Sequence, residues 1–143
     1  MTGNSGPYLL YSAVRAKKIL AKASAKDAFS ERSLEPVVTG LGRSVNGPSP
    51  FMLRKSTLVE AERSLVVKLL EYKNVLDEAV REMAPHKVAN YLYEVAQEFS
   101  RFYENCPVVG SDEEFERTKL VKVYFETMQH GLNILGIEIP EEM

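Results

Sequence analysis

Residues 85–106, PHKVANYLYEVAQEFSRFYENC, contain the clearest structural signal in the chain. Their large apolar side chains recur at steps of four, three, four and three, at Val88, Leu92, Val95, Phe99 and Phe102. This spacing places all of them on one face of an α-helix. Pro85 suits the first turn of a helix, where its missing N–H has no intrahelical partner to lose, and Pro107 stops the helix. The stretch therefore predicts a long amphipathic helix whose apolar face lies in the core.

The sequence after Pro107 predicts a second core helix. A short loop at residues 107–110 precedes Ser111, and Glu114 follows three residues later, which is the spacing of a capping box. The apolar positions of this segment again follow a helical period, at Val121, Tyr124, Met128, Leu132 and Leu135. Gly136 then suits the end of a helix, so we expect this one to stop there.

The sequence before Pro85 predicts three further helical segments. The first opens at Pro7 and runs to about residues 24–26. The stretch at about 24–55 is rich in Gly and Pro and lacks a sustained period, so we expect a long irregular loop there. A capping box of Thr57 and Glu60 predicts the next helix start. Around residues 72–74 the apolar pattern changes phase, which predicts a break.

The apolar positions on the two sides of this break each follow a helical spacing. They are Leu58, Ala61, Leu65 and Leu69 before it, and Val75, Ala79 and Met83 after it. Strand-like alternation is confined to the tail at 137–140, IEIP. The fold class is therefore predicted to be all-α, a bundle of about five helices.

Composition and charge indicate one globular domain with an uneven surface. The chain has 143 residues, 45% hydrophobic and 27% charged, and no run near the roughly 20 apolar residues of a membrane span. Its start does not resemble a signal peptide and its one cysteine is Cys106, so we expect a cytoplasmic protein. The net charge of −2 combines 9 − 3 = +6 over residues 1–55 with 9 − 17 = −8 over residues 56–143. A polyanion would be attracted to one side only.

Searches for catalytic and metal-binding patterns find little. The two histidines, His86 and His130, lie on separate predicted helices without a metal-ligand spacing. The glycine pair at 40–42 lacks the third glycine and the preceding strand of a dinucleotide-binding loop. The acidic run at 112–114 suits the first turn of a helix, where the dipole favours carboxylates. We therefore expect neither catalytic residues nor a metal site.

The predicted first helix carries the strongest functional signal. Its core face is expected to hold Leu9, Ala13, Ala16 and Leu20. A different face holds two tyrosines and three cations, namely Tyr8, Tyr11, Arg15, Lys18 and Lys22. Exposed aromatic rings among cations suit unstacked bases and phosphates, with Lys18 and Lys22 as candidate phosphate contacts. The alternative is that both rings pack against residues 24–55.

Three separate segments resemble one family. The first matches a Tyr-Leu-x-Tyr-x-x-x-Arg pattern with Tyr8, Leu9, Tyr11 and Arg15. The second matches Phe-Tyr-x-x-Cys-x-Val with Phe102, Tyr103, Cys106 and Val108. The third is the ending GLNILGIEIPEEM, with Gly131, Leu132, Leu135, Gly136, Ile137, Pro140, Glu141 and Met143 in place. In this order they are similar to the C-terminal DALR anticodon-binding domain of arginyl-tRNA synthetases.

This resemblance implies a helical domain, spanning residues 1–143, that binds the anticodon loop of arginine tRNA. Its implied contacts are Tyr8, Tyr11, Arg15, Tyr103 and Met143. Every arginine anticodon has C in the middle, so one pocket for a splayed-out cytosine serves all isoacceptors. The domain would need no cofactor and would bind neither DNA nor a membrane. Its parent enzyme, arginine-tRNA ligase, would use ATP with Mg and L-arginine.

Two features depart from the family. The predicted loop at 24–55 is longer than usual, and the sequences that form the ATP site of a Rossmann-type catalytic domain are absent from this chain. The chain is thus expected to be non-catalytic, with that catalytic domain as a second partner. Two alternatives stay open at this point. One is a protein-interaction bundle that docks through its acidic face, and the other is the related domain of another class I synthetase, such as the cysteinyl enzyme.

Overall fold

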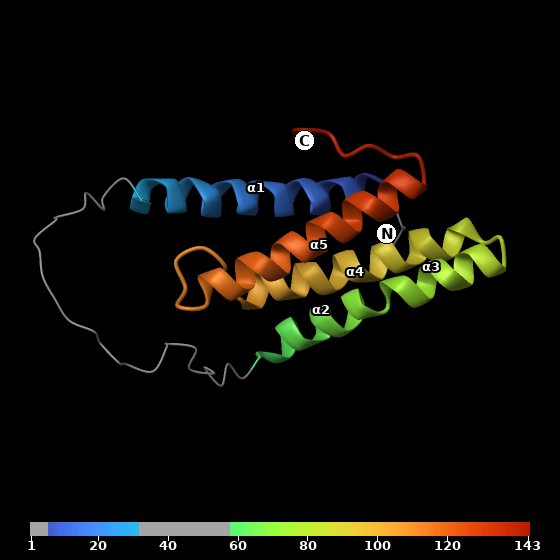
Figure 1. Cartoon of the computed structure of the whole chain (residues 1–143), viewed down its shortest axis with the longest axis horizontal. Coiled ribbons are helices and arrows are strands. Elements are labelled where there is room, and N and C mark those ends of the chain that lie inside the picture. Colours follow the sequence, from blue (N-terminus) through green and yellow to red (C-terminus); the bar gives the residue numbers. More distant parts are fainter. Residues whose placement is uncertain (1–5, 32–57) are drawn as a thin grey trace, which may run out of the picture.

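The computed structural model describes residues 6–31 and 58–143, which form five helices (Figure 1). The helices are α1 (Gly6–Glu31), α2 (Glu60–Leu70), α3 (Tyr72–Arg81), α4 (Pro85–Asn105) and α5 (Glu114–Ile134). The described ranges contain no strand. The prediction of an all-α bundle is therefore confirmed. Within the same ranges, no helix combines the length and the apolar character that a membrane crossing requires.

Helix α4 is the centre of the bundle and packs against each of the other four helices. Figure 1 shows α1 and α5 on one side of it and α2 and α3 on the other. The five apolar side chains that predicted this helix are all buried: Val88, Leu92, Val95, Phe99 and Phe102. The apolar face was predicted correctly because these five side chains recur at the helical period and all of them are buried.

Helix α5 supplies the second half of this core. Val121, Tyr124, Met128 and Leu132 are fully buried, and Leu135 is half-buried against them. Gly131 lies at a close approach of α5 to α4, since a Cβ atom there would be 2.6 Å from Cδ2 of Leu92. Gly136, with a φ of 75°, follows the end of the helix as predicted.

The first helix ends later than predicted. It continues to Glu31, whereas the sequence pattern indicated an end at about residues 24–26. The added segment, DAFSE at residues 27–31, contains neither Gly nor Pro, and the next strong helix breaker is Pro36, so nothing in its composition stops the helix after the apolar period fades. The remainder of the predicted loop at 24–55 lies outside the described residues.

The predicted break between α2 and α3 is confirmed at Glu71. A buried tyrosine of α4 stabilises the break, because the Tyr91 hydroxyl donates a hydrogen bond of 2.6 Å to the carbonyl of Lys68 in the last turn of α2. One apolar position after the break was predicted wrongly. Met83 is 91% exposed at a φ of 51°, because α3 ends at Arg81 and the chain turns away from the core.

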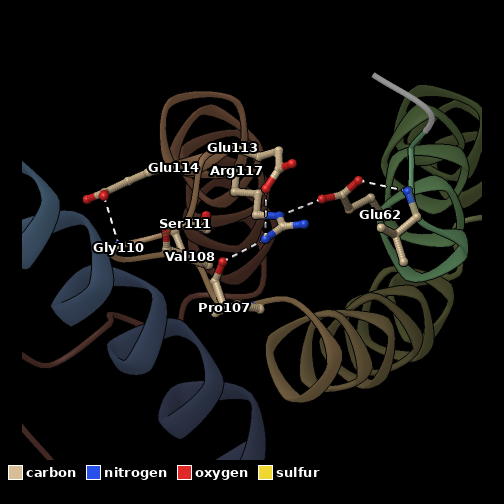
Figure 2. A network of polar contacts seen from close by, with 9 residues as sticks. Glu62, Pro107, Val108, Gly110, Ser111, Glu113, Glu114 and Arg117 are labelled. Carbon is tan, nitrogen blue, oxygen red and sulfur yellow. Dashed lines mark hydrogen bonds and ion pairs between the residues drawn. The ribbon is translucent and has the colours of Figure 1, made fainter. Parts of the chain in front are cut away.

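Neither helix begins where its predicted capping box placed the start. Helix α2 begins at Glu60, and the carboxylate of Glu62 accepts a hydrogen bond of 2.9 Å from the backbone N–H of Val59; Thr57 lies outside the described residues. Helix α5 begins at Glu114, not at Ser111. The Ser111 hydroxyl donates to the carbonyl of Val108 (3.2 Å), and the Glu114 carboxylate accepts from the N–H of Gly110 at 2.8 Å (Figure 2).

A buried ion pair explains why these helix starts differ from the prediction. Arg117 donates from Nε to Oε1 of Glu62 at 2.7 Å and from Nη1 to the carbonyl of Pro107 at 2.8 Å (Figure 2). Glu62 accepts from Arg117 and from the N–H of Val59 at once. The pair thus joins the starts of α2 and α5 to the loop that follows α4, a tertiary contact that sequence spacing did not indicate.

Candidate functional site

A groove of about 170 Å³ lies between α1, the end of α4 and the C-terminal tail. Its lining includes six of the seven residues that the sequence singled out, namely Tyr11, Arg15, Lys18, Lys22, Tyr103 and Met143. Val14 and Ile19 of α1 complete it. Three segments that are far apart in the sequence therefore meet at one surface.

Helical spacing brings the α1 members of the groove together. Tyr11 and Arg15 are four residues apart and therefore neighbours on the helix surface, and Lys18 and Lys22 continue the same stripe. From residue 6 to residue 25 this helix has four basic residues, Arg15, Lys17, Lys18 and Lys22, and no acidic one. The α1 side of the groove is therefore basic although the chain has a net negative charge.

The Arg15 guanidinium lies between two tyrosine rings. Its central carbon is 4.8 Å from the ring centre of Tyr11 and 5.2 Å from that of Tyr103. Its Nη2 also donates a hydrogen bond of 2.9 Å to the Tyr11 hydroxyl. Cation–π attraction and this hydrogen bond hold the guanidinium in a fixed orientation, and its other N–H groups can still reach a ligand.

The groove keeps a large apolar surface open to solvent. Tyr11 is 50% exposed, Tyr103 43% and Met143 56%. Half-exposed aromatic rings can stack on a planar ligand, and the neighbouring cations can pair with phosphate. This combination suits single-stranded nucleic acid.

Tyr8 does not line the groove. Its ring is half-buried against Tyr93 of α4, with centroids 5.4 Å apart, and its hydroxyl lies 3.2 Å from the Ser100 hydroxyl. The expectation that this ring is exposed on the Tyr11 stripe is therefore wrong. The reason is that α4 packs against α1 at this point, a partner that the sequence did not suggest for this ring.

Sequence reasoning missed the residues that lie behind the groove. Ser12 is buried on the core side of α1, and its hydroxyl is 2.6 Å from the hydroxyl of Tyr124 on α5. A signal for this contact was present, because Ser12 is a polar residue beside the apolar positions of α1 and a buried hydroxyl needs a partner.

The remaining candidates give no second site of this kind. His130 is bonded through Nδ1 to the Tyr72 hydroxyl at 2.6 Å, and His86 is exposed at the start of α4. Burial raises the pKa of the Cys106 thiol, which makes it a poor nucleophile. Among the residues that the structure describes, no three His, Cys, Asp or Glu side chains come together as a metal site.

A second, wider groove of about 490 Å³ lies between α2 and α4. Its lining is of mixed charge, with Arg63, Ser64, Val67, Lys68, Glu94, Gln97 and Glu98. Lys68 pairs with Glu94 there at 2.5 Å, so the cation is already matched by a carboxylate. This groove lacks the aromatic rings and the excess positive charge of the first.

Comparison with known proteins gives one consistent result. A model of the DALR anticodon binding domain matches residues 9–143. Arginine–tRNA ligase of Cellvibrio japonicus is 35% identical over 145 residues, which is 99% of this chain and 21% of that protein. The ligase of Laribacter hongkongensis is 33% identical over 143 residues, again 99% of this chain and 21% of that protein.

Solved structures agree with these sequence matches. Arginyl-tRNA synthetase of Thermus thermophilus superimposes with a TM-score of 0.73 at 28% identity, over 99% of this chain and 22% of that one. The chain spans about a fifth of the length of the relatives that it matches. Since the family model covers almost all of its residues, the chain belongs to the DALR anticodon-binding domain family.

Proposed function

We propose that this chain is the anticodon-binding part of an arginine-tRNA ligase and that it holds arginine tRNA at the groove formed by α1, α4 and the tail. The observation that carries the proposal is the Arg15 guanidinium held between the rings of Tyr11 and Tyr103. It combines a positioned cation with two half-exposed aromatic rings, a combination that suits single-stranded RNA. The matched relatives, named as arginine–tRNA ligases, supply the identity of the RNA.

In this proposal each part of the groove has its own task. An unstacked base, the middle cytosine of the anticodon, lies against Tyr11 or Tyr103, where stacking contributes about 1–3 kcal/mol per base. Arg15 donates to a phosphate or to the edge of the base. Lys18 and Lys22, both exposed along α1, pair with neighbouring phosphates. Met143 adds an apolar contact, and backbone groups of the tail read the edge of the base.

The parent enzyme would supply the chemistry that this chain does not. Its Rossmann-type catalytic domain would join L-arginine to the tRNA, with ATP and Mg as cofactors, in the cytoplasm. The present chain would position the tRNA for that reaction and would not catalyse it. Arginine-dependent exchange between ATP and pyrophosphate by this chain alone would contradict this division of tasks.

Binding of the chain to a transcript of arginine tRNA tests the proposal. We expect weak affinity that falls as salt rises, because each phosphate contact releases counterions. A transcript with the middle anticodon C replaced should bind more weakly. Arg15→Ala should reduce affinity about tenfold, the size expected for a charge-assisted contact.

Lys73→Ala is the matched control for Arg15→Ala. It also removes one positive charge, but from an exposed position on α3, on the other side of α4 from the groove. Equal losses of affinity for the two variants would show that binding depends on total charge and not on this groove. A stable complex with a protein partner, without any salt-sensitive RNA binding, would instead favour a protein-interaction bundle.

A further inference from the structure

A column of aromatic rings connects the core of the bundle to the groove. The ring of Tyr124 on α5 lies flat against Phe99 of α4, with centroids 4.0 Å apart and planes at 4°. Phe99 in turn stacks on Tyr103, one helical turn later, at 6.5 Å and 29°. Tyr103 then faces the Arg15 guanidinium in the groove. The inner rings are fully buried, and only the outer ring of the column reaches solvent.

Helix α1 is attached to both ends of this column. At the inner end, the Ser12 hydroxyl is 2.6 Å from the Tyr124 hydroxyl. At the outer end, Arg15 lies over Tyr103 at 5.2 Å. Because Ser12 and Arg15 are three residues apart on one helix, the hydrogen bond and the cation–π contact together fix where α1 lies relative to the column.

The buried end of the column cannot move without effect on the exposed end. The Tyr124 hydroxyl is buried, and a buried hydroxyl without a partner is costly, so loss of the Ser12 hydroxyl favours a shift of the Tyr124 ring or of α1. A close-packed interior transmits such a shift to its neighbours. Phe99 is enclosed, whereas Tyr103 is half-exposed and has room to move.

Resting on the function proposed above, we propose that Ser12 and Tyr124 are positioning residues that hold Tyr103 against Arg15 and thereby set the geometry of the RNA-binding groove. Neither residue lines the groove. Their effect on RNA must therefore pass through Tyr103, and this requirement gives a test that a role in stability alone does not satisfy.

The test is a double-mutant cycle of Ser12→Ala and Tyr103→Ala, measured as affinity for the arginine tRNA transcript. Tyr103→Ala should weaken binding about tenfold, the mid-range of a lost base stack. Ser12→Ala should weaken binding about two- to fivefold in the natural background, a size typical of coupled neighbours. In the Tyr103→Ala background, Ser12→Ala should change affinity by less than about 1.5-fold, because the ring that it positions is gone.

Tyr91→Phe is the control for a loss of stability. It removes another buried tyrosine hydroxyl, the one bonded to the Lys68 carbonyl at 2.6 Å, and neither Tyr91 nor Lys68 lines the groove. It should lower the free energy of unfolding, read from urea denaturation, without a change in RNA affinity.

The outcomes separate the two proposals. If Ser12→Ala leaves affinity unchanged, or weakens it equally in both backgrounds, the positioning role is refuted while the RNA-binding groove stands. If Tyr91→Phe weakens binding as much as Ser12→Ala does, affinity follows stability and the positioning role is again refuted. If the natural chain shows no salt-sensitive RNA binding, the proposed function itself fails.

Discussion

Replacement of Gly131 by Ala tests how tightly α4 and α5 are packed. The added Cβ would lie 2.6 Å from Cδ2, 3.0 Å from Cδ1 and 3.2 Å from Cγ of Leu92, a side chain that is fully buried. Since the enclosed Leu92 side chain cannot move aside, overpacking should lower the free energy of unfolding by about 1–3 kcal/mol. The higher helix propensity of Ala compared with Gly should raise the free energy of unfolding by about 1 kcal/mol. We therefore expect a net loss of about 1 kcal/mol in the free energy of unfolding.

Urea denaturation of the natural protein, the two single variants, the double variant and one control checks this reasoning. In a Leu92→Ala background the obstructing atoms are absent, so Gly131→Ala should there increase stability by about 1 kcal/mol through propensity alone. Asn133→Ala, at an exposed position of the same helix, is the control for propensity without a clash. If Gly131→Ala stabilised the natural protein as much as it stabilises the Leu92→Ala variant, the close approach of the two helices would be disproved.

Three further predictions follow from buried polar groups. Arg117→Ala should lower the free energy of unfolding by about 3–5 kcal/mol, because it leaves the Glu62 carboxylate buried without its cation. Joint replacement of the pair by Met and Leu should recover most of that loss. A loss below about 1 kcal/mol for Arg117→Ala would mean that the pair is hydrated. Thr118→Val should be neutral or stabilising in the same assay, since the Thr118 hydroxyl is buried with no hydrogen-bond partner among the described residues, and clear destabilisation would reveal a partner such as water. The Cys106 thiol, whose pKa is raised by burial, should react with a thiol reagent at pH 8 only as fast as the fold opens, and rapid labelling of the native chain would contradict this.

The sequence predicted features that depend on one repeating pattern better than those that depend on a single contact. The apolar face of α4 from Val88 to Phe102 was predicted because a helix that buries one face along its whole length has an apolar side chain at every third or fourth residue. The helix starts were not, since Glu62 is engaged by Arg117, a residue 55 positions away. A local spacing rule has no access to a partner at that distance.

The groove likewise combines features that a local pattern predicts with contacts that depend on the packing of distant segments. The Tyr11 stripe follows from helical geometry within α1, and Tyr103 and Met143 entered through resemblance to a family. Their meeting with Arg15 depends on how α1 packs along α4 and on the path of the tail, which no local pattern specifies. Tyr8 was misplaced for this reason, because only the packing of α4 decides that its ring turns inward.

The charge of the chain also becomes informative only after the fold is known. A net charge of −2 argues against a nucleic-acid partner if it is spread evenly. Residues 6–25, which form one side of the groove, have a charge of 4 − 0 = +4, while residues 58–143 have 9 − 17 = −8. A polyanion is thus attracted to the α1 side and repelled from the far side of the bundle. Because this field is sensitive to salt, it should affect the association rate more than the dissociation rate, whereas loss of the Tyr103 ring should do the reverse.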